Sequence, residues 1–211
     1  MSKFIKMISN ESSHIAMEQV SDIQTTIDES NSNPNKAKSP KELNKILNSF
    51  DYGFIVNGKK VEANKGSDYT SLSPEEFARY RCGVCWDFCC YEDKWFKQNC
   101  YKYNLYFMAS NYNRATHTFL IFKDNGKFYI FESSWYPMQG IREYSSEKEA
   151  YMDYLKTFKS KHSSDKYILF SYKQPKKYHM SAMDFLNYIY DNGTLLVNEK
   201  NMYEEMISEE N

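Results

Sequence analysis

The stretch Cys82-Gly-Val-Cys-Trp-Asp-Phe-Cys-Cys90 holds four of the five cysteines of the chain and decides how the rest of the sequence is interpreted. Gly83 permits a tight turn, and aromatic residues at helical spacing predict a helix over residues 85–99. Cys85 then lies at or near the start of that helix, where free amide N–H groups and the helix dipole stabilise a thiolate. The same amides can hold an oxyanion that forms when the sulfur attacks a carbonyl. Cys85 could instead be a small buried hydrophobic residue, so a catalytic function requires a base.

His117 is the histidine best placed to be that base. It begins an apolar strand over residues 116–122, and a second strand over residues 127–133 carries Glu132 after its apolar run. Three further histidines lie in polar or charged segments and are expected to be solvated: His14, His162 and His179. The sequence therefore offers a nucleophile, a base and an acid that orients the base, in the order Cys85, His117, Glu132.

The register of this hairpin decides whether the base and the acid can meet. A two-residue turn at Asn125-Gly126 pairs Asp124 with Lys127 and makes His117 and Glu132 diagonal neighbours on one face, about 7–8 Å apart. A four-residue loop would set them directly opposite each other. A three-residue loop would place them on opposite faces, because a slip of one residue reverses every side chain.

These residues resemble a known family. Gly83-Val-Cys-Trp-Asp-Phe88 resembles the transglutaminase motif that opens the central helix, and the His117 strand, followed by an acid and Trp135, resembles the same family's histidine and aspartate segments. The resemblance spans about residues 80–136 and points to the transglutaminase-like superfamily, a branch of the papain-like fold, and to one of its small bacterial or phage members. It implies that Cys85 forms a thioester, that His117 moves protons, and that the acid orients His117.

The chain departs from the family pattern at two positions. The usual acid is Asp, whereas Glu132 is one methylene longer, and Val84 stands where many members have Gln, Thr or Ser. No acidic loop has a calcium-binding pattern, so the resemblance does not carry the calcium dependence of the animal enzymes to this chain.

Aromatic residues next to the motif are candidates for substrate binding. Trp86 could border a substrate channel or belong to the core, and Trp135 and Tyr136 could form an aromatic wall beside the site or pack as ordinary core residues. Asp87 is expected to stabilise the helix N-terminus electrostatically. For an oxyanion donor outside the helix, only proximity suggests a choice, between Tyr80 and Arg81.

Two other uses of the cysteines are open. Cys82 and Cys85 have CxxC spacing, and Cys89 lies one helical turn beyond Cys85. Cys100 and a distant histidine could complete a zinc site, although structural zinc usually takes two separated ligand pairs and no second CxxC exists. A redox CxxC would follow a strand, whereas residues 73–81 have a helical pattern. A catalytically silent papain-like binding module is the remaining alternative.

Outside the motif, the pattern predicts one α+β domain over residues 39–195, with helices first and strands later. Residues 1–38 form a polar tail or a loosely docked helix, and residues 196–211 form an acidic C-terminal segment. Two capping signatures, Ser39-Pro-Lys-Glu42 and Ser73-Pro-Glu-Glu76, each mark the start of a helix. Further elements are predicted as a hairpin at 54–61, strands at 103–109 and 167–172, and helices at 147–159 and 181–190.

Composition sets the remaining expectations. The 211 residues carry a net charge of −1, which lacks the basic excess of a nucleic-acid binder, and no apolar run is long enough to cross a membrane. Without a signal peptide, the clustered, odd set of cysteines favours reduced thiols and a cytoplasmic protein. We therefore expect a cysteine hydrolase or acyltransferase that acts on an amide of a peptide or protein, without a cofactor or metal.

Overall fold

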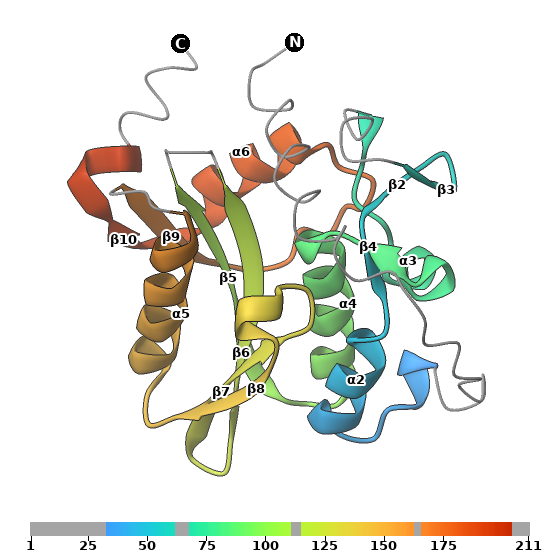
Figure 1. Ribbon diagram of the computed structural model, residues 1–211, viewed down its shortest axis with the longest axis horizontal. Coiled ribbons are helices and arrows are strands. Elements are labelled where there is room, and N and C mark those ends of the chain that lie inside the picture. Colours follow the sequence, from blue (N-terminus) through green and yellow to red (C-terminus); the bar gives the residue numbers. More distant parts are fainter. Residues whose placement is uncertain (1–32, 62–67, 111–114, 163–165, 204–211) are drawn as a thin grey trace.

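The computed structural model describes residues 33–61, 68–110, 115–162 and 166–203, and shows helices on both faces of a central sheet (Figure 1). The elements follow in the order η2 (Pro34–Lys36), α2 (Pro40–Leu47), β1 (Asp51–Tyr52), β2 (Phe54–Val56), β3 (Lys59–Val61), α3 (Pro74–Tyr80), β4 (Cys82–Gly83), α4 (Cys85–Gln98), β5 (Lys102–Ser110), β6 (Thr116–Asp124), β7 (Lys127–Glu132), η4 (Tyr136–Met138), β8 (Gly140–Tyr144), α5 (Glu147–His162), β9 (Tyr167–Tyr172), α6 (Ala182–Asn192), β10 (Thr194–Asn198) and η5 (Glu199–Asn201).

The central sheet has six strands in the order β10-β9-β5-β6-β7-β8, and all of its pairings are antiparallel. The hairpin of β6 and β7 has the two-residue turn expected from Asn125-Gly126, with Asp124 paired to Lys127. Both turn residues have positive φ, which is the geometry that an Asn-Gly pair adopts readily. Mixed helices and an antiparallel sheet agree with the α+β class expected from the sequence.

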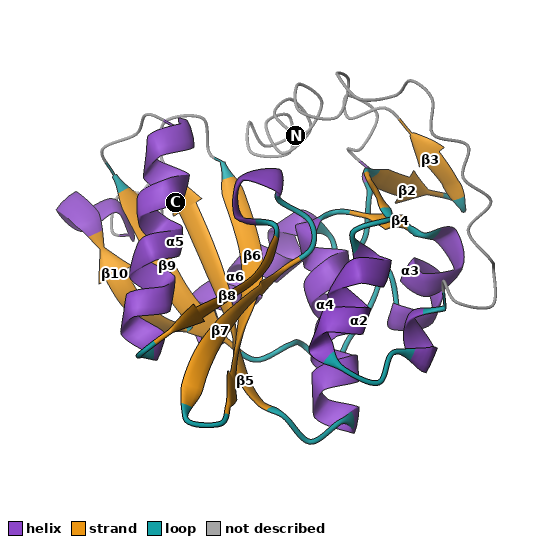
Figure 2. Ribbon diagram, turned by 60° about the horizontal axis from the view of Figure 1, so that its bottom comes forward, coloured by secondary structure: helices purple, strands orange, loops and turns teal. Residues whose placement is uncertain are grey.

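The sheet separates two hydrophobic clusters. On β6, Leu120 and Phe122 pack in the larger cluster with the aromatic face of α4, whereas Phe119 and Ile121 pack in the smaller cluster with α5. Figure 2 shows α4 and α5 on opposite sides of the strands. Alternate residues of the same strand therefore look toward different helices, and this alternation places the functional side chains described below.

Local sequence signals set the helix starts. Ser73 Oγ accepts from the Glu76 amide at 3.3 Å while Glu76 Oε2 accepts from the Ser73 amide at 2.9 Å, so the predicted capping box of α3 is formed. Ser39 caps α2 in the same way, but Glu42 Oε2 accepts from the amide of Lys38 instead.

The predicted hairpin at 54–61 and the helices and strands predicted after it are all present, with ends shifted by a few residues. The structure adds two strands to the sheet, β8 and β10, and a short parallel pair between β1 and β4. The predictions for residues 1–32 and 204–211 lie outside the described residues. Among the helices described, none is long and apolar enough to span a membrane.

Candidate active site

Cys85 is the first residue of α4, and a buried carboxylate holds the turn that precedes it. Asp87 accepts hydrogen bonds from the amides of Val84 at 2.9 Å and Leu72 at 2.8 Å. Burial raises the pKa of Asp87 to about 6, and these amide hydrogen bonds oppose the shift. Asp87 was expected to stabilise the start of α4 through its charge; in the structure it does so through hydrogen bonds to backbone amides, one of which ties the helix start to the segment before α3.

Gly83 is required by this packing. A Cβ at that position would lie 2.7 Å from the Cβ of Asp87 and 2.8 Å from a ring carbon of Phe77. Because a glycine fits there, the chain can turn closely from β4 into α4. The turn places Cys85 at the N-terminal end of α4, where the residue is buried, with 9% of its surface exposed.

His117 and Glu132 form a buried pair. The distance from His117 Nε2 to Glu132 Oε2 is 2.9 Å, and the two residues are 5% and 2% exposed. Burial alone would raise the pKa of Glu132, but the charge and hydrogen bond of His117 lower it below its usual value. A longer acid than the family's aspartate therefore still reaches the histidine in this hairpin.

Five hydrogen-bonding groups surround the Glu132 carboxylate. Oε1 accepts from the Ser134 amide at 2.6 Å, the Ser134 hydroxyl at 2.8 Å and the Trp135 amide at 2.8 Å. Oε2 accepts from the Tyr154 hydroxyl as well as from His117. A carboxylate held by this many donors stays ionised and fixes the imidazole in one orientation.

Cys85 and His117 influence each other's protonation. Burial would raise the pKa of the Cys85 thiol, but the charge of His117, a hydrogen bond to His117, and the amide and hydroxyl of Thr118 lower it below its usual value. Burial would lower the pKa of His117, but Glu132 and Cys85 raise it to about 10. Since Nε2 faces Glu132, Nδ1 is the nitrogen left for the sulfur, and the pair favours thiolate with imidazolium.

The candidate site lies where the pairing of β6 with β7 ends. His117 and Glu132 point to the face covered by α5, where Tyr154 contacts Glu132, whereas Cys85 comes from α4 on the other face. The β6–β7 ladder ends at Leu120 and Phe131. Beyond that pair the two strands separate, so the start of α4 can approach His117 from the other side.

The aromatic candidates occupy three different environments. Trp86 is 4% exposed and stacks on Phe185 of α6, with ring centroids 3.8 Å apart. Trp135 is 8% exposed, and its ring centroid lies 5.5 Å from that of His117. Tyr136 is 76% exposed. Trp135 is therefore the one of these three whose ring contact with the histidine is direct.

The oxyanion candidates suggested by proximity engage other groups. Arg79 Nη2 donates to the Tyr80 hydroxyl, and Arg81 Nη2 donates to Ser49 Oγ at 2.8 Å while its guanidinium lies over the Phe50 ring.

The positions of Tyr154 and His162 were not expected from the sequence, whereas that of His179 was. Tyr154 lies on a helix 22 residues after Glu132 and carries no local signal. His162, expected to be solvated, is half-buried at the end of α5, with its ring centroid 4.3 Å from that of Phe158. His179 is exposed as expected and lies 2.7 Å from Glu76.

Glu92 is a second buried acid near the site. It is 2% exposed on α4, seven residues after Cys85, so both lie on one side of the helix. Burial and the charge of Glu132 raise its pKa well above the usual value, although hydrogen bonds to Ser133 and Cys89 oppose the shift. The helical spacing from Cys85 is the signal that could have identified Glu92 in the sequence.

The other cysteines have a different character. All five are free, and burial raises the pKa of Cys82 to about 11 and that of Cys89 well above its usual value. Within the described part of the chain, no group of three or more His, Cys, Asp or Glu side chains is arranged to hold a metal ion.

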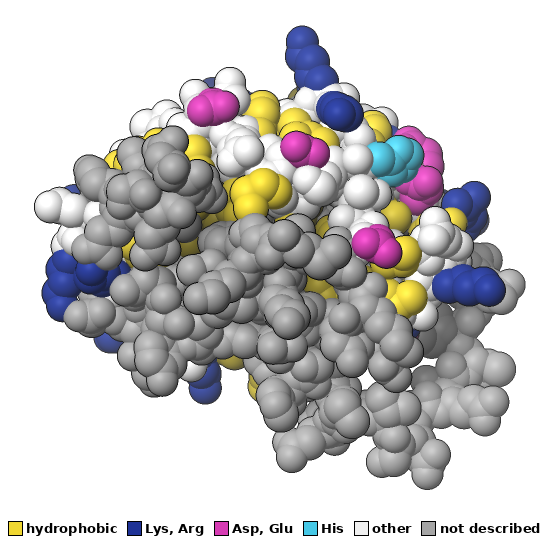
Figure 3. All heavy atoms as spheres, turned by 90° about the horizontal axis from the view of Figure 1, so that it is seen from above, with side chains coloured by type: hydrophobic (Ala, Val, Ile, Leu, Met, Phe, Trp, Pro, Cys, Tyr) yellow, Lys and Arg dark blue, Asp and Glu magenta, His cyan; other side chains and the backbone are white. Residues whose placement is uncertain are grey.

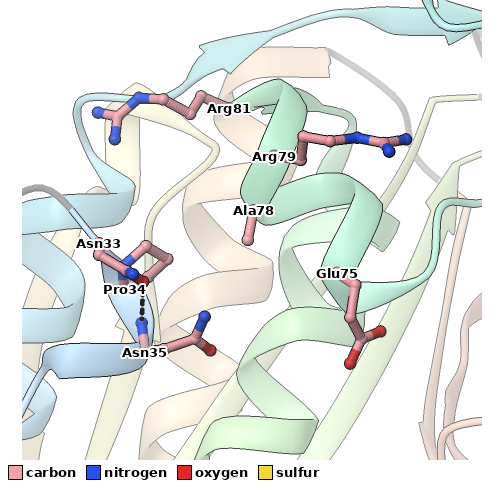
Figure 4. A pocket seen from close by; sticks show the side chains of 7 residues that line it. All are labelled: Asn33, Pro34, Asn35, Glu75, Ala78, Arg79 and Arg81. Carbon is pink, nitrogen blue, oxygen red and sulfur yellow. Dashed lines mark hydrogen bonds between the residues drawn. The ribbon is translucent and has the colours of Figure 1, made fainter.

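A surface pocket of about 340 Å³ lies between η2 and α3, and Figure 4 shows its lining. In this view Ala78 points downward from α3, between the side chains of Asn35 and Glu75. The side chains of Arg79 and Arg81 extend in different directions. The pocket is lined by no cysteine or histidine, so it is separate from the Cys85 site.

Comparison with known proteins assigns the family. A sequence model described as a transglutaminase-like domain matches residues 9–167, about three quarters of the chain and the whole segment that contains Cys85, His117 and Glu132. No curated protein matches the sequence. The chain therefore belongs to the transglutaminase-like domain family, within the papain-like superfamily.

Proposed function

We propose that this protein is a thiol-dependent hydrolase or acyltransferase that acts on an amide bond through Cys85, His117 and Glu132. The observation that supports it best is the buried His117–Glu132 pair, with 2.9 Å between Nε2 and Oε2, next to a thiol whose pKa is lowered. A structural cysteine in the same core has its pKa raised by burial, as Cys89 does. The amide belongs to a peptide or to a glutamine side chain, as in the family that the chain resembles.

The first half of the reaction forms a thioester. The Cys85 thiolate attacks the amide carbonyl carbon, a C–S bond forms, and the carbonyl π electrons move to oxygen. The first amides of α4 stabilise that oxyanion. The C–N bond then breaks as His117 Nδ1 gives its proton to the leaving nitrogen, which departs as ammonia or an amine. Glu132 holds the imidazole throughout and stabilises its cationic form.

The second half releases the acyl group. Neutral His117 takes a proton from water or from an amine as that molecule attacks the thioester carbon. The C–S bond breaks, and the thiolate and imidazolium are restored. Water gives a carboxylic acid and an amine gives a new amide, so access to the thioester decides between hydrolysis and transfer.

The surface charge bears on the class of substrate, and the thiols bear on the compartment in which the protein works. Lys, Arg, Asp and Glu side chains are mixed on the described surface in Figure 3, consistent with the net charge of −1, so a peptide or protein substrate is favoured over a polyanion. A lowered thiol pKa is useful only while the thiol stays reduced, and a cytoplasmic location would supply that condition.

Site-resolved alkylation tests the proposal. The native protein is treated with iodoacetamide at pH 6, and each modified cysteine is quantified by peptide mass spectrometry. Cys100 is exposed and serves as the internal reference within the same sample. We expect Cys85 to react faster than Cys100, and His117→Ala to abolish this preference. His179→Ala is the matched control, because His179 is exposed and pairs with Glu76.

The same samples separate the alternatives. Cys85 labelling that does not respond to His117→Ala, or one bound zinc per chain, would contradict the catalytic assignment. A reactive Cys85 that turns over no glutamine-containing peptide, with or without a primary amine, would favour the binding module. Ammonia release without amine incorporation would identify a hydrolase, and incorporation would identify an acyltransferase.

A further inference from the structure

The backbone of β6 is open toward β7 next to the candidate nucleophile. The two-residue turn is closed by a hydrogen-bonded pair at Asp124 and Lys127, so alternate residues of β6 direct their amides and carbonyls toward β7. Leu120 is in this set and pairs with Phe131, the last pair of the ladder. Thr118 is the next member of the set, and its backbone groups point into the gap that β7 leaves.

The side chain of Thr118 is also directed to the helix that carries the thiol. Since Thr118 alternates with His117, it lies on the same face as Leu120, toward α4. It is 2% exposed, and its Oγ1 has no hydrogen-bond partner among the described residues. A buried hydroxyl without such a partner is costly, unless another acceptor is present. The thiols of Cys85 and Cys89 are the groups within its reach.

We propose that Thr118 is a further donor to the reacting sulfur: its unpartnered hydroxyl donates to the Cys85 thiolate from the α4 side, while its amide points at the same atom from the strand edge. His117 then contacts the sulfur from the α5 side. Because Thr118 and His117 are consecutive, their side chains lie on opposite faces of the sheet, and the two residues contact the sulfur from both sides. This inference rests on the proposed function, because it assigns the hydroxyl a role in keeping Cys85 as the nucleophile.

The other groups around the sulfur do not replace this donor. The ionisable side chains that face Cys85 are His117 of β6, Cys89 of α4, Tyr154 of α5, Tyr172 of β9 and Tyr69 in the segment before α3. Four of these five are neutral at pH 7, and burial raises the pKa of each of the four well above its usual value. Only His117 offsets the cost of burying the thiolate by charge, so neutral donors such as Thr118 carry the remainder.

A pH series of Cys85 alkylation tests the role of the hydroxyl. Thr118→Val removes the hydroxyl and keeps the shape, whereas Thr118→Ser keeps the hydroxyl. A hydrogen bond to a charged group is strong enough that we expect Thr118→Val to slow Cys85 alkylation about tenfold at pH 6, with the profile displaced to higher pH. Thr118→Ser should stay within about threefold of the wild type. Thr157→Val is the matched control, because Thr157 Oγ1 donates to the Asp153 carbonyl on α5.

Each outcome has one interpretation. A Thr118→Val protein that folds and reacts within about twofold of the wild type at every pH overturns the role of the hydroxyl. If Thr118→Val does not fold, Thr118→Ala removes the same hydroxyl without adding bulk, and the same comparison is made. If wild-type Cys85 reacts no faster than Cys100 and ignores His117→Ala, the proposed function itself has failed. A low-pH reactivity that depends on His117 but not on Thr118 refutes this inference alone.

Discussion

Replacing Glu132 by Gln tests the central electrostatic claim, because the side chain keeps its size while losing its charge. Glu132 Oε1 accepts from the amides of Ser134 and Trp135, and Oε2 accepts from His117 and Tyr154. If the glutamine places its oxygen where Oε1 of Glu132 lies, its NH₂ group takes the place of Oε2 and faces His117 and the Tyr154 hydroxyl. His117 must then present an unprotonated Nε2, which leaves its proton on Nδ1, the nitrogen that faces the thiol.

The size of the effect follows from the protonation states. With Glu132 present, the pKa of His117 is raised to about 10 and the pKa of Cys85 lies below the usual 9.0, so the ionised share of the Cys85 thiol at pH 7 is larger than that of an ordinary thiol. Without the charge of Glu132 the imidazolium is not maintained, and burial returns the thiol pKa to its usual value or above. Alkylation follows the ionised share of the thiol, so each unit by which the thiol pKa rises should slow alkylation at pH 7 about tenfold.

The free energy of unfolding should also depend on pH through Glu132 and His117. The lowered pKa of Glu132 gives stability that is present above its unfolded value of 4.5 and is lost as the pH falls through the folded value. The raised pKa of His117 gives stability that is present below 6.5 and is lost as the pH rises through about 10. Urea unfolding of the wild type should therefore show both losses, and Glu132→Gln should show neither.

The assay is the rate constant for Cys85 alkylation from pH 5 to pH 10, resolved by mass spectrometry, with circular dichroism to verify folding. Glu143→Gln is the matched control, because that acid is exposed on β8 and pairs with Lys127. Glu132→Asp keeps the charge and should retain part of the reactivity at pH 6. The reasoning is refuted if folded Glu132→Gln has the wild-type rate at pH 7, since the ion pair would then not depend on the acid.

Two further substitutions test the buried framework of the site. Gly83→Ala should lower the free energy of unfolding by about 1–3 kcal/mol in urea, because the added Cβ would lie 2.7 Å from the Cβ of Asp87; an unchanged midpoint would show that the turn relaxes. Glu92→Gln should raise the free energy of unfolding at pH 7 by roughly 1–3 kcal/mol, because folding of the wild type takes up a proton at Glu92. The gain should shrink as the pH approaches 4, and a less stable variant at pH 7 would mean that Glu92 is ionised in the folded protein.

The hairpin shows how far the sequence alone can reach. Asn125-Gly126 specifies a turn, the turn specifies the pairing of Asp124 with Lys127, and that pairing places His117 and Glu132 on one face. Each step depends on neighbours in the sequence. For the same reason the capping signature at Ser73 correctly predicted the start of α3.

Contacts between distant segments could not be predicted in this way. Nothing near Tyr154 in the sequence indicates that its hydroxyl reaches Glu132, because α5 docks through its whole apolar side. Strand β8 is only half-buried and β10 is largely exposed, so neither has the apolar alternation that identifies a strand. These edge strands are specified by the ladder that they extend.

The open edge of β6 is what lets one site use both faces of the sheet, and a helix far away in the sequence maintains it. If the β6–β7 ladder continued, the next hydrogen-bonded pair would join Thr118 to Ser133 and occupy the backbone that faces Cys85. Instead, Asn44 Nδ2 of α2 donates to the Glu132 carbonyl at 2.8 Å and to Ser133 Oγ at 3.2 Å, and so holds the end of β7 away. Asn44 is 7% exposed, so this amide is part of the core. A hydrogen bond from a helix far away in the sequence thereby keeps the backbone of Thr118 free of β7, on the side that faces Cys85.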